Sequence, residues 1–144
     1  MTAKIYPYLT FENAKEAMDY YVQNFGAQIT YHQPLSEQQA ENIGLRTDSL
    51  TDTTLYAEFS VAGQKIVCAD ATMGHPQTST LISIMLNFGE DKSRAQQFFK
   101  QLADSDEQRV TVPFGNWING GMMGQVVDHY GVTWIICTGN DIAD

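Results

Sequence analysis

The residues whose side chains are best suited to catalysis or ligand binding are one acid and a group of aromatic residues. Glu58 lies in the run Leu55 to Val61, where apolar and polar residues alternate. Alternation sends successive side chains of a strand to opposite faces, so Glu58 would point away from the apolar set. Apolar surroundings disfavour a charged carboxylate, which makes Glu58 a candidate catalytic general acid or base. A structural, hydrogen-bonded carboxylate is the alternative interpretation.

Phenol, indole and thioether side chains form the candidate ligand-binding set. Such groups combine an apolar body with a polar tip and suit a flat or aromatic ligand. The set is Tyr6, Tyr8, Tyr56, Met85 and Trp117, with Gln125 as an amide contact. Core packing would explain most of these residues equally well.

Histidine and cysteine spacing does not predict a metal site. His32, His75 and His129 are far apart, on one predicted strand and in two loops. Cys68 and Cys137 lie in apolar runs without a Cys-x-x-Cys spacing, which is typical of reduced, buried thiols. We therefore expect no metal and no cofactor.

Length and charge limit the class of protein. A chain of 144 residues forms one compact domain, or two half-size modules sharing a core. Eight Lys and Arg against seventeen Asp and Glu give a net charge of −9, which repels nucleic acid and anionic membranes. Because no signal peptide or membrane-length apolar run is visible, a cytoplasmic protein is expected.

One pattern of predicted helices and strands occurs twice along the chain. Helical spacing of apolar residues predicts helices over Asn13 to Phe25 and about Asp91 to Ala103. Asn13 can cap the first helix and Gly26 can end it. The segment Ala17-Met18-Asp19-Tyr20-Tyr21 is echoed by Ala95-Gln96-Gln97-Phe98-Phe99.

Each predicted helix is preceded by one strand and followed by three. The first set is Ile5 to Phe11, Ala27 to Gln33, Leu55 to Val61 and Gln64 to Asp70. The second set is Leu81 to Phe88, Arg109 to Val112, Met122 to Asp128 and Val132 to Thr138. The fold class is thus α+β, with two βαβββ modules, about 1–72 and about 79–140, in a single domain over 1–144. The loop Pro34 to Asp52 could hold a short helix at Glu37 to Ile43, and Ala71 to Ser79 connects the modules.

A sheet with a helix on one face needs cover on its other face, so we expect two curved mixed sheets that enclose a cleft. Alternation predicts the helix-facing residues Ile5, Leu9, Phe11, Leu55, Ala57, Phe59, Val61, Ile82, Ile84, Leu86 and Phe88. The same alternation predicts that a second set of side chains faces the cleft: Tyr6, Tyr8, Thr10, Tyr56, Glu58, Ser60, Ser83, Met85 and Asn87.

Four segments carry a family resemblance: Tyr6-Pro7-Tyr8-Leu9-Thr10-Phe11, Phe25-Gly26-Ala27, Tyr56-Ala57-Glu58-Phe59 and the run from Gly124 to Trp134. They resemble the PhnB-like branch of the vicinal-oxygen-chelate (glyoxalase/bleomycin-resistance/dihydroxybiphenyl dioxygenase) superfamily, whose members usually have Pro and Phe at His129 and Tyr130. The resemblance spans nearly the whole chain and implies the fold more strongly than an activity.

The resemblance also implies where a divalent metal would be bound. Catalytic members use His, Glu or Gln from the first and last strands of each module. The matching positions here are about Tyr6, Val67 or Cys68, Ser83 and Ile135. These residues cannot replace a His and Glu ligand set.

Two functions follow from the sequence. The first is a cytoplasmic binding protein, comparable to bleomycin-resistance proteins, which holds a small, partly aromatic or apolar molecule without a metal. The second is a lyase, isomerase or dioxygenase-type enzyme that uses Glu58 or a displaced metal site. The resemblance implies a homodimer. Members of this branch are sometimes labelled demethylubiquinone methyltransferases, but the sequence has no glycine-rich nucleotide-binding segment for a methyl donor.

Overall fold

The computed structural model describes residues 2–44, 50–72 and 74–139. The chain divides into two compact units, Met1–Gln77 and Thr78–Asp144. We call them the first and second modules and describe each by itself. Within the described ranges, no helix has the length and apolar character needed to cross a membrane.

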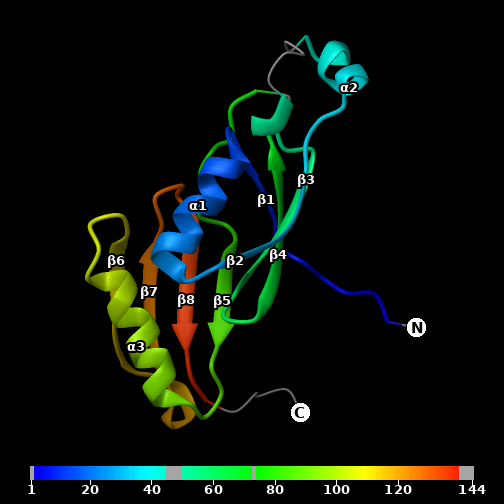
Figure 1. Cartoon of the computed structure of the whole chain (residues 1–144). Coiled ribbons are helices and arrows are strands. Elements are labelled where there is room, and N and C mark those ends of the chain that lie inside the picture. The colour runs from blue at the N-terminus through cyan, green and yellow to red at the C-terminus, as the bar shows by residue number, and fades with distance from the viewer. Residues whose placement is uncertain (1, 45–49, 73, 140–144) are drawn as a thin grey trace. The chain divides into compact units, whose positions relative to one another are not determined.

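The first module is a four-stranded sheet with one long helix (Figure 1). Its elements are β1 (Tyr8–Phe11), α1 (Ala14–Phe25), β2 (Gln28–Gln33), α2 (Glu37–Asn42), the 3-10 turn η1 (Leu50–Asp52), β3 (Tyr56–Val61) and β4 (Gln64–Asp70). The strand order is β1-β4-β3-β2. β1 runs parallel to β4, and the other neighbours are antiparallel.

The second module repeats this plan. Its elements are β5 (Ser83–Asn87), α3 (Lys92–Ala103), β6 (Arg109–Asn116), the 3-10 turn η2 (Ile118–Gly120), β7 (Met122–Val127) and β8 (Thr133–Cys137). The order β5-β8-β7-β6 has the same parallel and antiparallel pairs. The prediction of two βαβββ modules is therefore confirmed.

Both long helices begin after a side chain that caps them, and the predicted cap Asn13 is one of the two. Asn13 accepts a hydrogen bond from the Glu16 backbone N–H at 3.0 Å, and Gly26 ends α1 at a φ of +67°. Asp91 caps α3 by accepting from the Arg94 N–H at 3.0 Å. The short helix predicted in the polar loop is present as α2, while residues 45–49 of that loop lie outside the described ranges.

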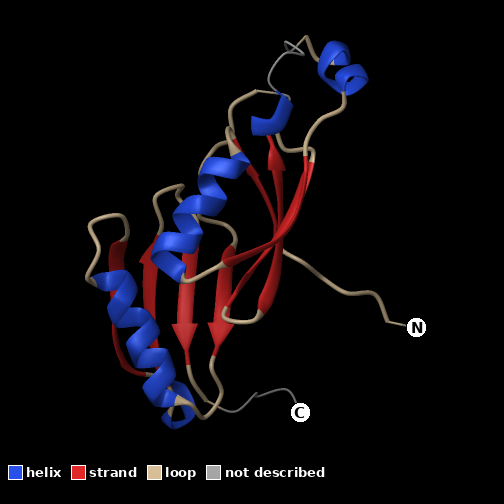
Figure 2. Ribbon diagram, viewed as in Figure 1, coloured by secondary structure: helices blue, strands red, loops and turns tan. Residues whose placement is uncertain are grey.

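Each long helix covers one face of its own sheet (Figure 2). In the first module the Tyr21 ring stacks on Phe59 at 5.3 Å, with 16° between the ring planes. Phe11, Ala57, Phe59 and Val61 are buried on this face, as alternation predicts. The core of the module therefore lies between α1 and the sheet.

The core of the second module centres on Trp134, which is fully buried. Its indole Nε1 donates to the Asp128 carboxylate at 2.9 Å. The same carboxylate accepts from the backbone N–H groups of Tyr130 and Val132, at 2.8 and 3.0 Å. Asp128 thereby satisfies three donors around the turn between β7 and β8.

Two residues predicted to face a helix do not. Ile5 is 96 % exposed and Ile82 is 73 % exposed, because β1 begins only at Tyr8 and β5 only at Ser83. Pro7 precedes β1, and a proline has no N–H for a ladder bond. The prediction of a core role for Ile5 and Ile82 is therefore wrong.

The two cysteines are buried free thiols, as predicted. Burial, assisted by the negative charge of Asp70, raises the pKa of Cys68 to about 12. A thiol of this kind stays protonated and unreactive at neutral pH.

Candidate functional site

The face of the first sheet opposite α1 carries a row of side chains that crosses all four strands. Strand register aligns Tyr8 with Val67, Val67 with Glu58, and Glu58 with Tyr31. Tyr8 is 59 % exposed and Tyr31 is 47 % exposed. Glu58 therefore lies in the middle of this face, with a phenol toward each edge of the sheet.

A bulge in β2 brings Tyr31 into this row. The register between β2 and β3 shifts between Ile29 and Tyr31, so Thr30 has no partner position of its own. The Thr30 hydroxyl donates instead to the backbone oxygen of Glu58 at 3.1 Å. Simple alternation could not place Tyr31, because one extra residue moves every later side chain to the other face.

Glu58 forms an ion pair that the sequence analysis missed. The Lys65 Nζ is 2.9 Å from Glu58 Oε1. Lys65 on β4 pairs with Ser60 on β3, so it lies diagonal to Glu58. A long side chain can reach a residue at this diagonal position. The Glu58 side chain is only 18 % exposed, whereas that of Lys65 is 46 % exposed. The expectation that Glu58 has purely apolar and aromatic surroundings is therefore incomplete.

Aromatic rings complete the group around this ion pair. Lys65 Nζ is 5.2 Å from the centroid of the Tyr6 ring, a cation–π distance. The Tyr31 and Tyr56 rings are 6.0 Å apart. We call Tyr6, Tyr31, Tyr56, Glu58 and Lys65 the Glu58 cluster.

The cluster is electrostatically coupled. Desolvation raises the pKa of the Tyr56 hydroxyl, and the charge of Glu58 and a hydrogen bond with it act in the same direction. The hydrogen bond and the charge of Glu58 also raise the pKa of Lys65. A neutral phenol and a charged ammonium thus both bind to one carboxylate at neutral pH.

The second sheet has a corresponding row with different chemistry. Register aligns Met85 with Ile135, Ile135 with Gln125, and Gln125 with Val112. β6 has a bulge like that of β2, and the Thr111 hydroxyl donates to the backbone oxygen of Gln125 at 3.3 Å. Gln125 therefore holds the position that Glu58 holds in the first module, but no residue of this row is charged.

Trp117 lies apart from that row. It precedes η2, is half-buried, and its backbone N–H donates to the Gly121 oxygen at 2.8 Å. Of the predicted site residues, the structure brings together Tyr6, Tyr56 and Glu58 in the cluster and places Tyr8 in the same row. In the second module it aligns Met85 and Gln125 through Ile135.

The metal-ligand positions of the superfamily do not fit a metal here. Val67 has no donor atom, and Cys68 is buried at the helix-facing position beside Ala57. Ser83 and Ile135 are the matching residues in the second module. Over the described ranges, no group of three His, Cys, Asp or Glu side chains lies close enough together to bind an ion.

The three histidines have separate partners. His32 Nε2 is 2.9 Å from the Thr54 hydroxyl, and His75 contacts Glu12. His129 Nδ1 is 3.7 Å from a Glu107 oxygen. These contacts do not connect the three histidines with one another, and no group of three metal-binding side chains is found among the described residues.

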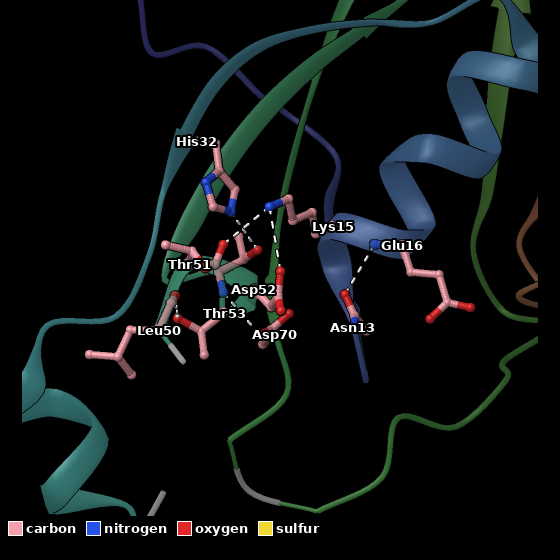
Figure 3. A network of polar contacts seen from close by, with 10 residues as sticks. Asn13, Lys15, Glu16, His32, Leu50, Thr51, Asp52, Thr53 and Asp70 are labelled. Carbon is pink, nitrogen blue, oxygen red and sulfur yellow. Dashed lines mark hydrogen bonds and ion pairs between the residues drawn. The ribbon is translucent and has the colours of Figure 1, made fainter. Parts of the chain in front are cut away.

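A second polar network, at the end of β4, positions the first module's elements (Figure 3). Asp70 accepts from the backbone N–H groups of Ala14 and Thr54, at 2.8 and 2.9 Å. Lys15 donates to the Thr51 oxygen at 3.2 Å and lies 3.6 Å from Asp52. These bonds tie the start of α1 and the segment before β3 to the sheet, so this network is structural.

Comparison with known proteins gives the family. The sequence profile of the 3-demethylubiquinone-9 3-methyltransferase family matches residues 3–137. No curated protein has a matching sequence. A PhnB protein from Bacillus cereus, described as a 3-demethylubiquinone-9 3-methyltransferase, has a similar structure, with 26 % identity and a TM-score of 0.68. That match covers 95 % of this chain and 100 % of the other.

More distant structures share the fold. PA1353 from Pseudomonas aeruginosa has 23 % identity and a TM-score of 0.68, covering 97 % of this chain and 100 % of that one. The fosfomycin resistance protein FosX from Listeria monocytogenes, solved with Mn(II) and a dihydroxypropylphosphonic acid, has 14 % identity and a TM-score of 0.64. That match covers 97 % of this chain and 94 % of FosX. The chain therefore belongs to the 3-demethylubiquinone-9 3-methyltransferase family, the PhnB-like branch of the vicinal-oxygen-chelate superfamily.

Proposed function

We propose that the protein binds a small, partly aromatic or apolar molecule on the face of the first sheet opposite α1, without a divalent metal. The observation that carries this proposal is the row of exposed phenols on either side of Glu58. Phenol rings offer stacking surface, and their hydroxyls together with Glu58 and Lys65 offer hydrogen bonds that fix a ligand's orientation.

The donor set supports metal-independent binding. The resemblance matches the metal-binding positions of catalytic relatives to about Tyr6, Val67 or Cys68, Ser83 and Ile135. These residues provide weak oxygen donors, hydrocarbon side chains and, at Cys68, a buried thiol that stays protonated. Titration with Ni, Zn, Mn and Fe salts, followed by metal analysis, tests this point. Stoichiometric tight binding of one of these ions would overturn it.

For the second module, taken by itself, we propose Met85, Gln125 and Trp117 as candidate ligand contacts. Met85 is 52 % exposed, Gln125 and Trp117 are half-buried, and all three were predicted from the sequence. The apolar surface of Met85 and Trp117 suits the body of a ligand, whereas the Gln125 amide suits a polar group. Truncation of each residue by itself measures its contribution.

A thermal-shift screen with planar aromatic metabolites, followed by calorimetry on each hit, tests the proposed function. Tyr8→Ala is the variant to compare with the wild type, because Tyr8 is 59 % exposed and lies outside the buried core. We expect Tyr8→Ala to weaken binding about tenfold, the size of one lost stacking contact. Equal affinity in the wild type and Tyr8→Ala would remove this face from the proposed site.

A proton-transfer enzyme is a second candidate, supported by the contact of Glu58 with the Tyr56 hydroxyl. In such an enzyme Glu58 would take or return a substrate proton. The Lys65 ion pair favours the binding function, because it already uses the Glu58 carboxylate. Full turnover by Glu58→Gln on a substrate found in the screen would exclude this mechanism.

A homodimer is proposed from the family resemblance. Light scattering at micromolar concentration should give twice the chain mass of 16.1 kDa. A mass of one chain would contradict the proposal.

A further inference from the structure

We infer that the ligand of this site carries a positively charged nitrogen, and that the Lys65 ammonium occupies the place of that nitrogen in the free protein. The inference rests on the proposed function and names the ligand's charge. Lys65 would then be a built-in competitor that the ligand displaces from Glu58.

The position of the Lys65 ammonium carries the inference. It is 2.9 Å from a Glu58 oxygen and 5.2 Å from the Tyr6 ring centroid. A carboxylate with nearby aromatic faces is the arrangement that binds organic ammonium groups, through charge and through the ring quadrupole. Lys65 shows that a cation fits between these groups.

The two members of the ion pair differ in how firmly they are held. Glu58 is on a central strand, is 18 % exposed, and contacts the Tyr56 hydroxyl. Lys65 is 46 % exposed and ends a flexible four-carbon chain. The lysine can therefore turn out to solvent while the carboxylate stays in place to receive another cation.

Charge favours a cationic ligand over an anionic one. An anion that paired with Lys65 would have to lie close to the Glu58 carboxylate, because the two groups are in contact. The chain as a whole carries a charge of −9, which attracts cations and repels anions over longer distances. The Tyr6 ring, 5.2 Å from the Lys65 ammonium, adds attraction for a positive charge only.

Three probes with one ring and different charges test the inference: benzylammonium, benzyl alcohol and benzoate. Calorimetry would compare the wild type with Lys65→Met, which keeps most of the side-chain length but removes the competing charge. We expect benzylammonium to bind Lys65→Met at least tenfold tighter than the wild type, with little change for benzyl alcohol. Adding Glu58→Gln to Lys65→Met should abolish that gain.

Lys92→Met on α3 is the matched control, because it removes the same charge from the second module. It should leave benzylammonium affinity at the wild-type value, and thermal melts establish that each variant is folded. An equal gain in Lys92→Met, no gain in Lys65→Met, or preference of the wild type for benzoate would overturn the inference.

The probes also separate this inference from the proposed function. Equal binding of benzyl alcohol and benzylammonium by Lys65→Met would leave an aromatic site in place and reject the cation. Failure of all three probes to bind the wild type and Lys65→Met would contradict both proposals.

Discussion

The two modules share one backbone plan, yet their sheet faces opposite the long helices differ in chemistry. Tyr8, Val67, Glu58 and Tyr31 cross the first sheet, whereas Met85, Ile135, Gln125 and Val112 cross the second. Even the bulge threonine is repeated, with Thr30 on Glu58 and Thr111 on Gln125. A repeated scaffold has thus kept its geometry while charge and phenols are concentrated in one copy.

The positions that maintain the scaffold differ between the copies as well. In the first module Asp70, at the end of β4, accepts from the Thr54 N–H at 2.9 Å. In the second, the Thr138 hydroxyl, just beyond β8, accepts from the Met122 N–H in the same way, at 2.9 Å. The strand-end bond has been preserved with a different acceptor.

The largest expected effect on stability comes from the buried acid of the second module. Asp128→Ala would leave the N–H groups of Tyr130, Val132 and Trp134 without this acceptor, at about 1 kcal/mol or more for each donor. We expect a loss of about 3 kcal/mol in urea unfolding. Asp70→Ala removes two such bonds and should cost about 2 kcal/mol. A larger loss of stability from Asp70→Ala than from Asp128→Ala would contradict this order.

A smaller loss of stability is expected from a substitution at Gly124, where the second module has a glycine at the position of a buried alanine in the first module. Gly124 precedes Gln125 as Ala57 precedes Glu58, but a Cβ at Gly124 would lie 2.5 Å from the Phe99 ring. Gly124→Ala should therefore destabilise the protein by about 1–3 kcal/mol. A Phe99→Leu change in the same chain should recover part of that loss. If Gly124→Ala is neutral by itself, the close helix–sheet packing described for this module is wrong.

The smallest expected effect is the pH dependence of stability that comes from Cys68 in the first module. It does not change stability at neutral pH. Burial raises the pKa of Cys68 from 9.0 to about 12, so folding keeps the thiol protonated while the unfolded chain ionises near pH 9. Stability is thus fully present below pH 9 and falls as the pH rises toward 12. The raised pKa values of Tyr56 and Lys65 act in the same direction.

Urea midpoints of the wild type and Cys68→Ala at pH 7 and at about pH 10 test this prediction. The cost of the substitution at pH 7 measures lost packing alone. That cost should shrink at the higher pH, because the variant has no thiol to ionise on unfolding. An unchanged cost at both pH values would mean that Cys68 titrates alike in the folded and unfolded chain.

Much of the fold could be predicted because helix caps and strand alternation are local signals. Asn13 and Gly26 bound α1, and alternating burial along β3 follows the order of polar and apolar residues. Strand starts were less visible, as Ile5 and Ile82 show, because an apolar residue beyond the ladder looks the same in sequence as one inside it.

The site was only partly predictable. Tyr6, Tyr8, Tyr56 and Glu58 were found by alternation within single strands. Tyr31 depended on a bulge, and Lys65 on a diagonal contact across two strands. Both features belong to strand pairing, which single-strand periodicity does not contain. A basic residue on the strand that pairs with the strand of Glu58 is the sequence signal that could have suggested the ion pair with Lys65.

The most direct test of the account is an NMR titration of the protein with benzylammonium, with backbone amides assigned in both modules. If polar recognition belongs to the first module, the largest shift changes will fall on Glu58, Tyr31, Tyr56 and Lys65, and Glu58→Gln will remove them. Largest changes at Met85 and Gln125 that persist in Glu58→Gln would contradict the account.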